Sequence, residues 1–350
     1  MYIRATGNIS PQKTFGQGAF PDTPQAYTGN RLYCAEPDYK EIIDVKLIRR
    51  MSRIIKMGVA AALECLQEAT ITVPDAIITG TAYGCLEDTG HFITKMAEHN
   101  EELLTPTAFI QSTHNTIGAQ IGLLLKCNNY NNAYVHRGFS FETALLDGLL
   151  LLKEKDAGNV LVGGIDEITD ISHAIISRMG IYKGGSAANP DLFTSPSKGT
   201  IAGEGAAFFL LSDQPSAKDH AKLDAITVFY KPKDHTETAQ QVQSFLSAQN
   251  IRVSDIDLVI TGRNGDQEND EVYDRLQQTV FKNAGQANYK HLCGEYPTST
   301  AFALWVATRI ARSGDVPAIL NYRAPGKIKK ILIYNNYMGI HHSLLLISAC

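Results

Sequence analysis

The sequence contains no pair of closely spaced cysteines. Its six cysteines lie far apart, without a CxxC motif: Cys34, Cys65, Cys85, Cys127, Cys293 and Cys350. We therefore expect no disulfide framework, no metal site and no cofactor. The longest apolar runs, such as "ALLDGLLLL", are too short to span a bilayer. The N-terminus, "MYIRATGNIS", lacks the apolar core of a signal peptide. These absences predict a cytoplasmic protein without membrane contact.

Positive charge is not in excess either. The chain has 32 Lys and Arg against 36 Asp and Glu, a formal net charge of −4. Broad contact with nucleic acid phosphates is therefore not expected. One local exception is "KLIRRMSRIIK", where basic residues share a predicted helical stripe: Lys46, Arg49, Arg50, Arg53 and Lys56. This stripe is either a solvated helix face or a contact site for an acidic partner.

Apolar strand-like runs alternate with helical patterns along the whole chain, which favours an α/β fold. The runs are nearly continuous, as expected for strands buried on both faces. Strands are predicted within 75–84, 159–167, 206–212, 257–265, 329–336 and 342–348. Helices are predicted at 43–69, 116–126, 142–153, 270–283 and 299–312.

The two halves of the chain resemble each other. "DAIITGTAYGCLED" in the first half matches "DLVITGRNGDQEND" in the second. His114 follows Gly80 by 34 residues, and Tyr296 follows Gly262 by the same interval. Matching segments in the same order indicate an internal duplication. We place the N-terminal half at 1–213 and the C-terminal half at 214–350.

The segment "YVHRGFSFETALLDGLLLL" (134–152) reads as a strand that turns sharply into a buried helix. Gly138, Phe139 and Ser140 lie at the turn. A helix N-terminus stabilises negative charge, so such a turn is a common place for a nucleophile. Ser140 is the only candidate there, and a capping or packing role is the alternative for its hydroxyl.

Several motifs resemble those of the ketoacyl synthase family. The similar segments cover nearly the whole chain: "LIRRMSRIIKMGVAAALECLQEA", "ITGTAYGCLED", "LTPTAFIQSTHNTIGAQIGLLL", "GNVLVGGIDE" and "GTIAGEGAAFFLL". The resemblance implies the thiolase fold, in which two similar halves, each a mixed sheet with helices, are layered α-β-α-β-α. In "GEGAA" we expect the glycines to permit close backbone approach.

Condensing enzymes of that family use a Cys at the turn and two His, with a Lys nearby. This sequence departs from the pattern at three of these positions. Phe139 and Ser140 stand near the position of the Cys, and Asn264 stands at that of the first His. In "KHLCGEY", Lys290 is retained but Glu295 replaces the second His. Glu295 could pair with Lys290, which would neutralise both charges.

The resemblance therefore implies a ketosynthase-like protein without the Cys-His-His set. Short chains with "GFSFE" and "NGD" at these positions resemble the chain-length-factor-like proteins of aryl polyene, flexirubin and dialkylresorcinol pathways. Such proteins pair with an active ketosynthase and shape the acyl tunnel. On this interpretation Phe139 and Phe141 limit the tunnel, and His114 and Cys293 line it. Arg49, Arg50 and Arg53 would then contact an acyl carrier protein.

Two alternatives remain open at this stage. One is an active acyltransferase or condensing enzyme that uses Ser140 or Cys293 as nucleophile, with Glu295 or Lys290 as base. The other is a homodimeric protein that binds acyl chains. Cys293 has a packing role as its plain alternative.

Overall fold

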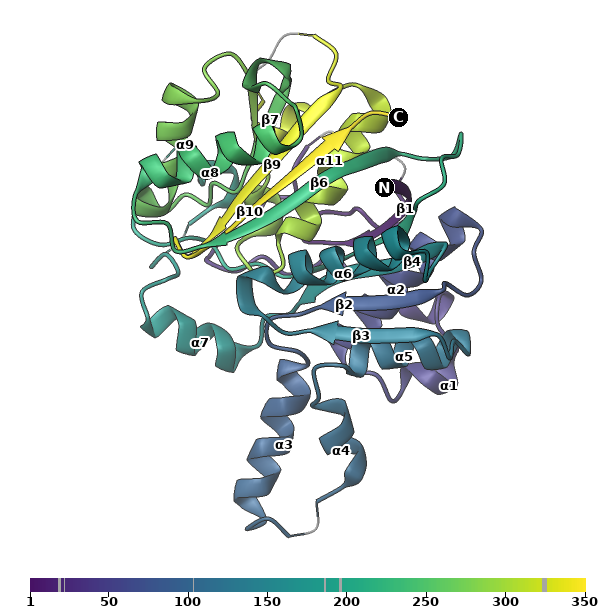
Figure 1. The fold of residues 1–350 in the computed structure, drawn as a ribbon. Coiled ribbons are helices and arrows are strands. Elements are labelled where there is room, and N and C mark those ends of the chain that lie inside the picture. Colours follow the sequence, from purple (N-terminus) through teal and green to yellow (C-terminus); the bar gives the residue numbers. More distant parts are fainter. Residues whose placement is uncertain (18–19, 22, 103, 186, 195–196, 323–325) are drawn as a thin grey trace.

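The computed structural model describes residues 1–17, 20–21, 23–102, 104–185, 187–194, 197–322 and 326–350. Within these ranges, ten strands form one sheet of order β3-β2-β4-β5-β1-β6-β10-β9-β7-β8 (Figure 1). The strands are β1 (Tyr2–Ile9), β2 (Ala76–Gly80), β3 (Tyr130–Tyr134), β4 (Asn159–Asp166), β5 (Gly205–Ser212), β6 (Ala221–Tyr230), β7 (Leu258–Thr261), β8 (Gly285–Asn288), β9 (Lys330–Tyr337) and β10 (His341–Ser348).

The first five strands and the last five follow the same pattern. β2 runs parallel to β3 and β4, as β7 runs parallel to β8 and β9. β5 pairs antiparallel with β4 and β1, as β10 pairs with β9 and β6. The halves join where β1 meets β6, through Tyr2 opposite Lys222 and Ile3 opposite Ala221. The predicted duplicated α/β fold is confirmed; its boundary at 213/214, between β5 and β6, stays a prediction.

Helices pack on the outer face of each half of the sheet, and further helices lie between the two halves. α6 and α11 pack between the halves, α2 and α5 on the outer face of the first half, and α8 and α9 on the outer face of the second (Figure 1). These layers follow the predicted order α-β-α-β-α. Their bounds are α2 (Arg53–Ala69), α5 (Thr116–Leu125), α6 (Ser140–Glu154), α8 (His235–Ala248), α9 (Gln267–Thr279) and α11 (Thr300–Ser313).

The strands are apolar on both faces because each half of the sheet separates two cores. Along β2, Ala76 and Ile78 belong to the central core around α6 and α11. Ile77, between them, belongs to the outer core under α2 and α5. Successive strand residues point to opposite faces, so a strand with a core on each side must be apolar at every position.

One predicted helix is wrong in its extent. Residues 43–69 form two helices, α1 (Val45–Ile48) and α2, separated by 49–52. The Asp44 side chain caps the first helix at Lys46 N–H, and Ser52 is extended and begins the second. The basic residues of this segment therefore do not share one helical stripe.

The remaining elements are short or lie at the surface. They are α3 (Leu86–Glu98), α4 (Pro106–Gln111), α7 (Asp170–Arg178), α10 (Lys290–Cys293) and the 3-10 turns η1 (Tyr39–Glu41), η2 (Arg137–Phe139), η3 (Asn189–Asp191), η4 (Val253–Asp255) and η5 (Ala318–Leu320). α3 and α4 project from the body as an arm (Figure 1). Over the described ranges, each helix is too short or too polar to cross a membrane.

Candidate functional site

The positions predicted to replace the two histidines lie together in a buried polar network. Lys290 Nζ lies 2.8 Å from Glu295 Oε1 and 2.7 Å from Glu295 Oε2. Asn264 Nδ2 donates to the same Oε2 at 2.7 Å. All three side chains are buried. Burial raises the pKa of Glu295, while Lys290 and the Asn264 amide oppose the shift. The predicted pairing of Lys290 with Glu295 is present.

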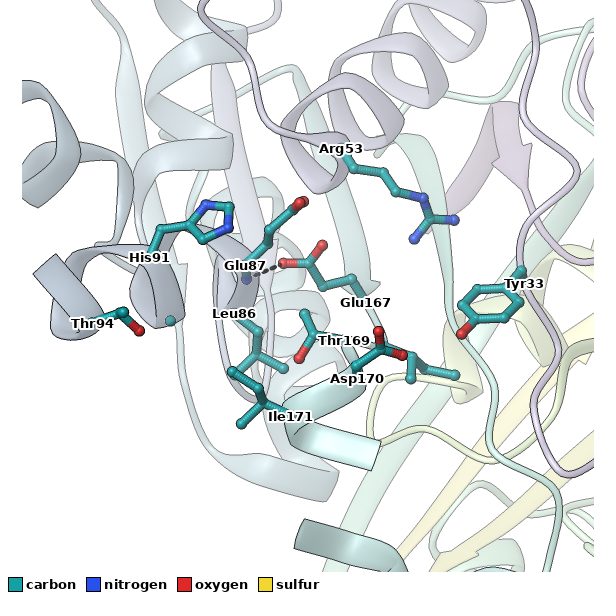
Figure 2. Close-up of a pocket in the computed structure, with 12 residues that line it drawn as sticks. Tyr33, Arg53, Leu86, Glu87, His91, Thr94, Glu167, Thr169, Asp170 and Ile171 are labelled. Atoms are coloured by element: carbon teal, nitrogen blue, oxygen red, sulfur yellow. Dashed lines mark hydrogen bonds between the residues drawn. The ribbon is translucent and has the colours of Figure 1, made fainter. Parts of the chain in front are cut away.

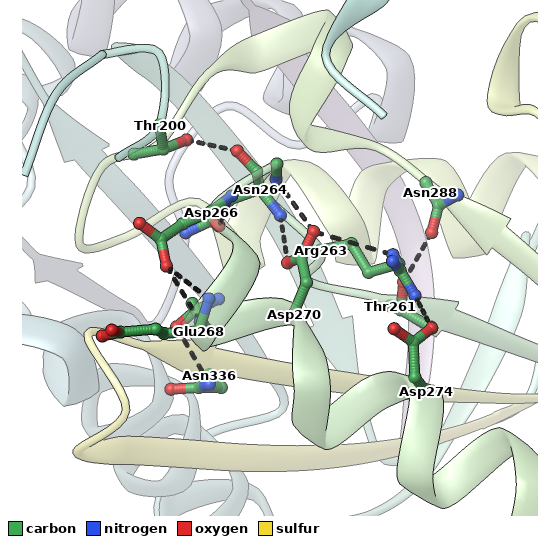
Figure 3. A network of polar contacts seen from close by, with 12 residues as sticks. Thr200, Thr261, Arg263, Asn264, Asp266, Glu268, Asp270, Asp274, Asn288 and Asn336 are labelled. Carbon is green, nitrogen blue, oxygen red and sulfur yellow. Dashed lines mark hydrogen bonds and ion pairs between the residues drawn. The ribbon is translucent and has the colours of Figure 1, made fainter. Parts of the chain in front are cut away.

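Asn264 is fixed by the loop that follows β7 (Figure 3). Asp270, in the first turn of α9, accepts the N–H groups of Asn264 at 2.9 Å and of Gly265 at 3.0 Å. The Thr200 hydroxyl donates to the Asn264 carbonyl at 2.6 Å, and Asp266 N–H donates to its side-chain Oδ1 at 3.0 Å. The amide is therefore held at both ends, and it neither gains nor loses a proton near neutral pH.

A cavity of about 330 Å³ opens in front of this network. Asn264 and Glu295 form part of its wall, and the β9–β10 turn forms another part. Its lining is Gly180, Ile181, Thr200, Asn264, Asp266, Glu268, Asn269, Glu295, Met338 and Gly339. Among the residues that the structure describes, no histidine and no cysteine belongs to that lining.

The turn before α6 holds the predicted nucleophile position. Arg137 has φ of 47°, an unusual conformation for a residue other than glycine, and it makes the sharp entry to the helix. Ser140 is the first helical residue, and Phe139 precedes it. The Ser140 hydroxyl accepts His136 N–H and donates to the Arg137 carbonyl, both at 2.8 Å. The hydroxyl thus links two backbone groups of the turn. This is a structural role, but it is not that of a helix N-cap, because Ser140 is already the first residue of α6.

Phe139 sits in an aromatic cluster at this turn. Its ring centroid lies 4.7 Å from that of His341 and 5.5 Å from that of His136, both edge-on. Gly138 permits the approach, because a Cβ there would lie 2.9 Å from Cβ of His341. Phe139 is 5% exposed. Its predicted role in limiting an acyl chain stays a prediction.

Phe141 and Cys293 belong to the central core, and their predicted contact with substrate stays a prediction. Phe141 is fully buried, and its ring packs on Phe209 at 5.8 Å. Cys293 is fully buried, and its Sγ lies 3.3 Å from the Gly294 carbonyl. Burial raises the pKa of the Cys293 thiol, which opposes formation of a thiolate. For Cys293 these contacts favour the packing role that the sequence left as an alternative.

The remaining predicted contacts divide between the surface and an internal ion pair. His114 is exposed, beside Gly84, in the turn between α4 and α5, away from the 330 Å³ cavity. Arg49 and Arg50 are exposed. Arg53 is different: its guanidinium binds the buried carboxylate of Glu204, with Nη1 2.7 Å from Oε2, and also Glu36. Arg53 therefore joins α2 to the segment before β5, and its predicted contact with a carrier protein stays a prediction.

Glu142 is a buried acidic residue that the sequence motifs did not single out. It lies in the first turn of α6, fully buried, and its two carboxyl oxygens lack a hydrogen-bond partner among the described residues. Burial raises its pKa to about 7, against the opposing influence of the nearby Thr300 and Ser343 hydroxyls and of Lys290. The signal available in the sequence was an acidic residue on the otherwise apolar face of this helix.

We expect Glu142→Gln to flatten the pH dependence of stability between pH 5 and pH 8. The native pKa lies above the ordinary value of 4.5, so the folded state keeps a proton that the unfolded state loses. Wild-type stability is therefore lost as pH rises towards 7, by about 3 kcal/mol in total. Denaturant unfolding at several pH values measures the slope. Equal slopes for variant and wild type would contradict the assignment.

Comparison with known proteins supports the fold and the family resemblance. Residues 34–182 match the family model for the beta-ketoacyl synthase N-terminal domain. Curated protein sequences gave no match. Among solved structures, the ishigamide ketosynthase/chain length factor has a TM-score of 0.81 and 15% identity, covering 100% of this chain and 98% of that chain.

Two further structures are similar over the whole chain. One is a type II polyketide synthase acyl-carrier protein in complex with its ketosynthase bound to the hexaketide, with TM-score 0.78, 12% identity, and coverage of 100% and 99%. The other is a ketosynthase in complex with its chain length factor from Xenorhabdus doucetiae, with TM-score 0.73, 15% identity, and coverage of 100% and 98%. Residues 34–182 are therefore similar to the beta-ketoacyl synthase N-terminal domain, and the chain has the fold of these ketosynthase structures over its whole length.

Proposed function

We propose that this protein is a non-condensing partner of an active ketosynthase, of the chain-length-factor type. The observation that carries the proposal is the closed network of Asn264, Lys290 and Glu295, which occupies the place expected for two imidazoles. A carboxylate paired with an ammonium group cannot donate a hydrogen bond to a developing oxyanion. In this network the Lys290 ammonium and the Glu295 carboxylate are bound to each other, so neither is free to act as the acid or base of a condensation.

The nucleophile positions support the same conclusion. Condensation needs a group that accepts the acyl chain covalently. The Ser140 hydroxyl is bound to two backbone groups of its own turn. The Cys293 thiol is fully buried in the core and has a raised pKa. An acyltransferase that uses either residue would need the turn or the core to rearrange, so we favour the silent partner.

The surface supports association with another subunit. α3 and α4 contain no buried residue, and the Phe92 and Phe109 rings pack on each other at 5.6 Å. β3 is an edge strand of the sheet and exposes Tyr130 and Val135 beside it. Further apolar side chains are exposed nearby on α3, α4 and α5: Ile93, Phe109, Ile110 and Leu123. Open apolar edges of this kind favour pairing with another chain.

We propose that the occupant of this face is a ketosynthase, because two of the similar structures are named as a ketosynthase with a chain length factor. Within such a pair, Phe139 would add bulk at the end of the acyl tunnel. The exposed Arg49 and Arg50 would attract an acidic acyl carrier protein. A cytoplasmic location, without nucleic acid or membrane partners, remains our expectation.

The test is intact-mass analysis after incubation with an acyl-carrier thioester, with and without ketosynthases encoded near the gene. We expect no acyl adduct on this chain, an adduct on the ketosynthase, and a 1:1 complex on size-exclusion chromatography. An intact ketosynthase run alone is the positive control for acylation. A stable adduct on Ser140 or Cys293 would instead support the acyltransferase. A homodimer that purifies with bound lipid and does not bind ketosynthases would support the alternative of an acyl-chain-binding protein.

A further inference from the structure

Outside the site described above, an acidic cavity of about 360 Å³ lies between the start of α3 and the start of α7 (Figure 2). Three acidic residues line it: Glu87, Glu167 and Asp170. Glu167 Oε1 accepts the N–H of Glu87 at 3.1 Å, and Asp170 pairs with Arg31. Glu167 and Asp170 therefore have partners within the chain, and we assign no ligand to this cavity.

A different cavity, of about 570 Å³, contains a serine and a lysine in direct contact. Lys183 Nζ lies 2.6 Å from Ser197 Oγ, and both residues line the cavity. The other lining residues among those that the structure describes are Gly184, Ala187, Ala188, Asp191, Leu192 and Lys198. The volume is in the range of small-molecule sites. A hydroxyl and an amine in contact form the pair that some hydrolytic enzymes use as nucleophile and base.

Lys183 lies among uncharged hydrogen-bond partners. The residue is 7% exposed, and its Nζ also contacts the Gly265 carbonyl at 2.9 Å and the Ser197 carbonyl at 3.4 Å. Burial lowers the pKa of the Lys183 ammonium, while Asp266 and Asp270 oppose the shift. Carbonyls can only accept, so the Ser197 hydroxyl is the one partner of these three that can donate a proton. A neutral amine would donate to both carbonyls and accept from the hydroxyl, as a general base must.

Backbone contacts hold the serine and the lysine on two different segments. Ser197 forms a parallel bridge with Asp266, which caps the start of α9. Lys183 N–H donates to the Thr200 carbonyl at 2.8 Å, and the Asn30 side chain donates to the Lys183 carbonyl at 2.9 Å. Both residues are therefore positioned before any ligand binds, which lowers the cost of bringing a nucleophile and its base together.

We propose that Ser197 and Lys183 form a hydrolytic site for short acyl esters or thioesters. The Ser197 Oγ attacks the acyl carbonyl carbon, and the hydroxyl proton moves to the neutral Lys183 amine. The bond from the acyl carbon to the leaving oxygen or sulfur breaks, and Lys183 passes the proton to that leaving group. Water then attacks the acyl-serine ester by the same proton route, which releases the carboxylic acid and restores the Ser197 hydroxyl.

The other residues of the cavity match this chemistry. Lys198 lines the cavity, and an ammonium group beside the acyl carbonyl stabilises the oxyanion that forms during attack. Ala187, Ala188 and Leu192 provide an apolar wall for the acyl group. The limited volume favours short chains over long ones.

The reaction should become faster as pH rises, because only the neutral Lys183 amine can accept the serine proton. Four charged groups face the pair or lie near it. They are Asp191 and Lys198 in the cavity, and Asp266 and Asp270 near the Lys183 ammonium. The two aspartates near the ammonium favour its charged form, so the rise should continue into the alkaline range.

The experiment uses the full chain alone with three probes. A fluorophosphonate tests the nucleophile, p-nitrophenyl acetate tests ester hydrolysis, and the acetyl thioester of N-acetylcysteamine tests thioester hydrolysis. We expect the fluorophosphonate to label Ser197, as located by peptide mapping, and at least one acetyl probe to be hydrolysed. Which probe reacts faster identifies the preferred leaving group.

Ser197→Ala should abolish the labelling and lower hydrolysis by about 100-fold or more. Lys183→Arg keeps the positive charge but supplies no base, because a guanidinium group stays protonated, so a similar loss is expected. Ser244→Ala, at an exposed serine on α8, is the matched control and should be labelled and hydrolyse as wild type does. Thermal melting of each variant checks that a lost activity does not come from loss of the fold.

The inference is overturned if Ser197 stays unlabelled and if hydrolysis is the same in wild type, Ser197→Ala and Lys183→Arg. The pair would then be only a structural contact between two segments. Labelling at Ser140 instead would also overturn it. These assays contain no ketosynthase, so their failure leaves the proposed function standing. Because water removes the acyl group, acyl-Ser197 is not expected to accumulate in the intact-mass experiment described above.

Discussion

Replacing Lys290 with methionine is expected to lower the free energy of unfolding by about 3–5 kcal/mol. The substitution keeps the length of the side chain but leaves Glu295 buried without its cation, with only the Asn264 amide as a hydrogen-bond donor. Burial already raises the pKa of Glu295, so the carboxyl group can take up a proton in the variant. The loss of stability should therefore be larger at pH 8 than at pH 5. Denaturant unfolding at both pH values measures it.

The double variant Lys290→Met/Glu295→Gln separates pairing from packing. Removing both charges should restore most of the lost stability, because a buried pair costs desolvation that a neutral pair does not. Glu295→Gln alone should destabilise, since it leaves the ammonium group buried. If the single and double variants are equally unstable, the ion pair is not what holds this region together. The cycle thus measures how strongly Lys290 and Glu295 are coupled in the folded protein.

The positions of six strands could be predicted because short apolar runs mark them. β2, β4, β5, β7, β9 and β10 all fall on apolar runs recognised in the sequence. The pairing of Lys290 with Glu295 was foreseen because both flank one turn. Asn264 lies beside them because its loop follows β7, parallel to β8, which leads into α10. Parallel strands deliver their following loops to one edge of a sheet.

Other features depend on contacts that a linear pattern does not contain. β1, β6 and β8 mix polar and apolar residues, so these strands could not be predicted from an apolar run. Arg53 looked like one member of an exposed stripe, yet its partner Glu204 lies 151 residues away. Phe141 and Cys293 are predicted to contact the acyl chain, but their burial in the central core, together with residues of α11, could not be read from the sequence. α3 and α4 contain no buried residue, and no helix was predicted for either segment.

The "GEGAA" segment gives the second large prediction: Gly203→Ala is expected to destabilise the protein by at least about 3 kcal/mol. A Cβ at Gly203 would lie 1.9 Å from the carbonyl oxygen of Cys293 and 2.6 Å from Cα of Gly294. Both are backbone atoms, so neither can move without separating the segment before β5 from α10. The same crossing is held by Gly203 N–H donating to the Glu295 carbonyl at 3.0 Å. The expected close backbone approach is therefore present.

Gly184→Ala is the matched control for this substitution. It is exposed, and a Cβ there would meet no atom within 4 Å, so its effect on stability should stay within about 0.5 kcal/mol. Thermal and denaturant unfolding of both variants provide the comparison. Gly203 N–H binds the backbone carbonyl of Glu295. If Gly203→Ala separates these two segments, the Lys290–Glu295 pair should also become exposed to solvent. A Gly203→Ala protein as stable as the control would mean that the two halves do not cross as closely as described.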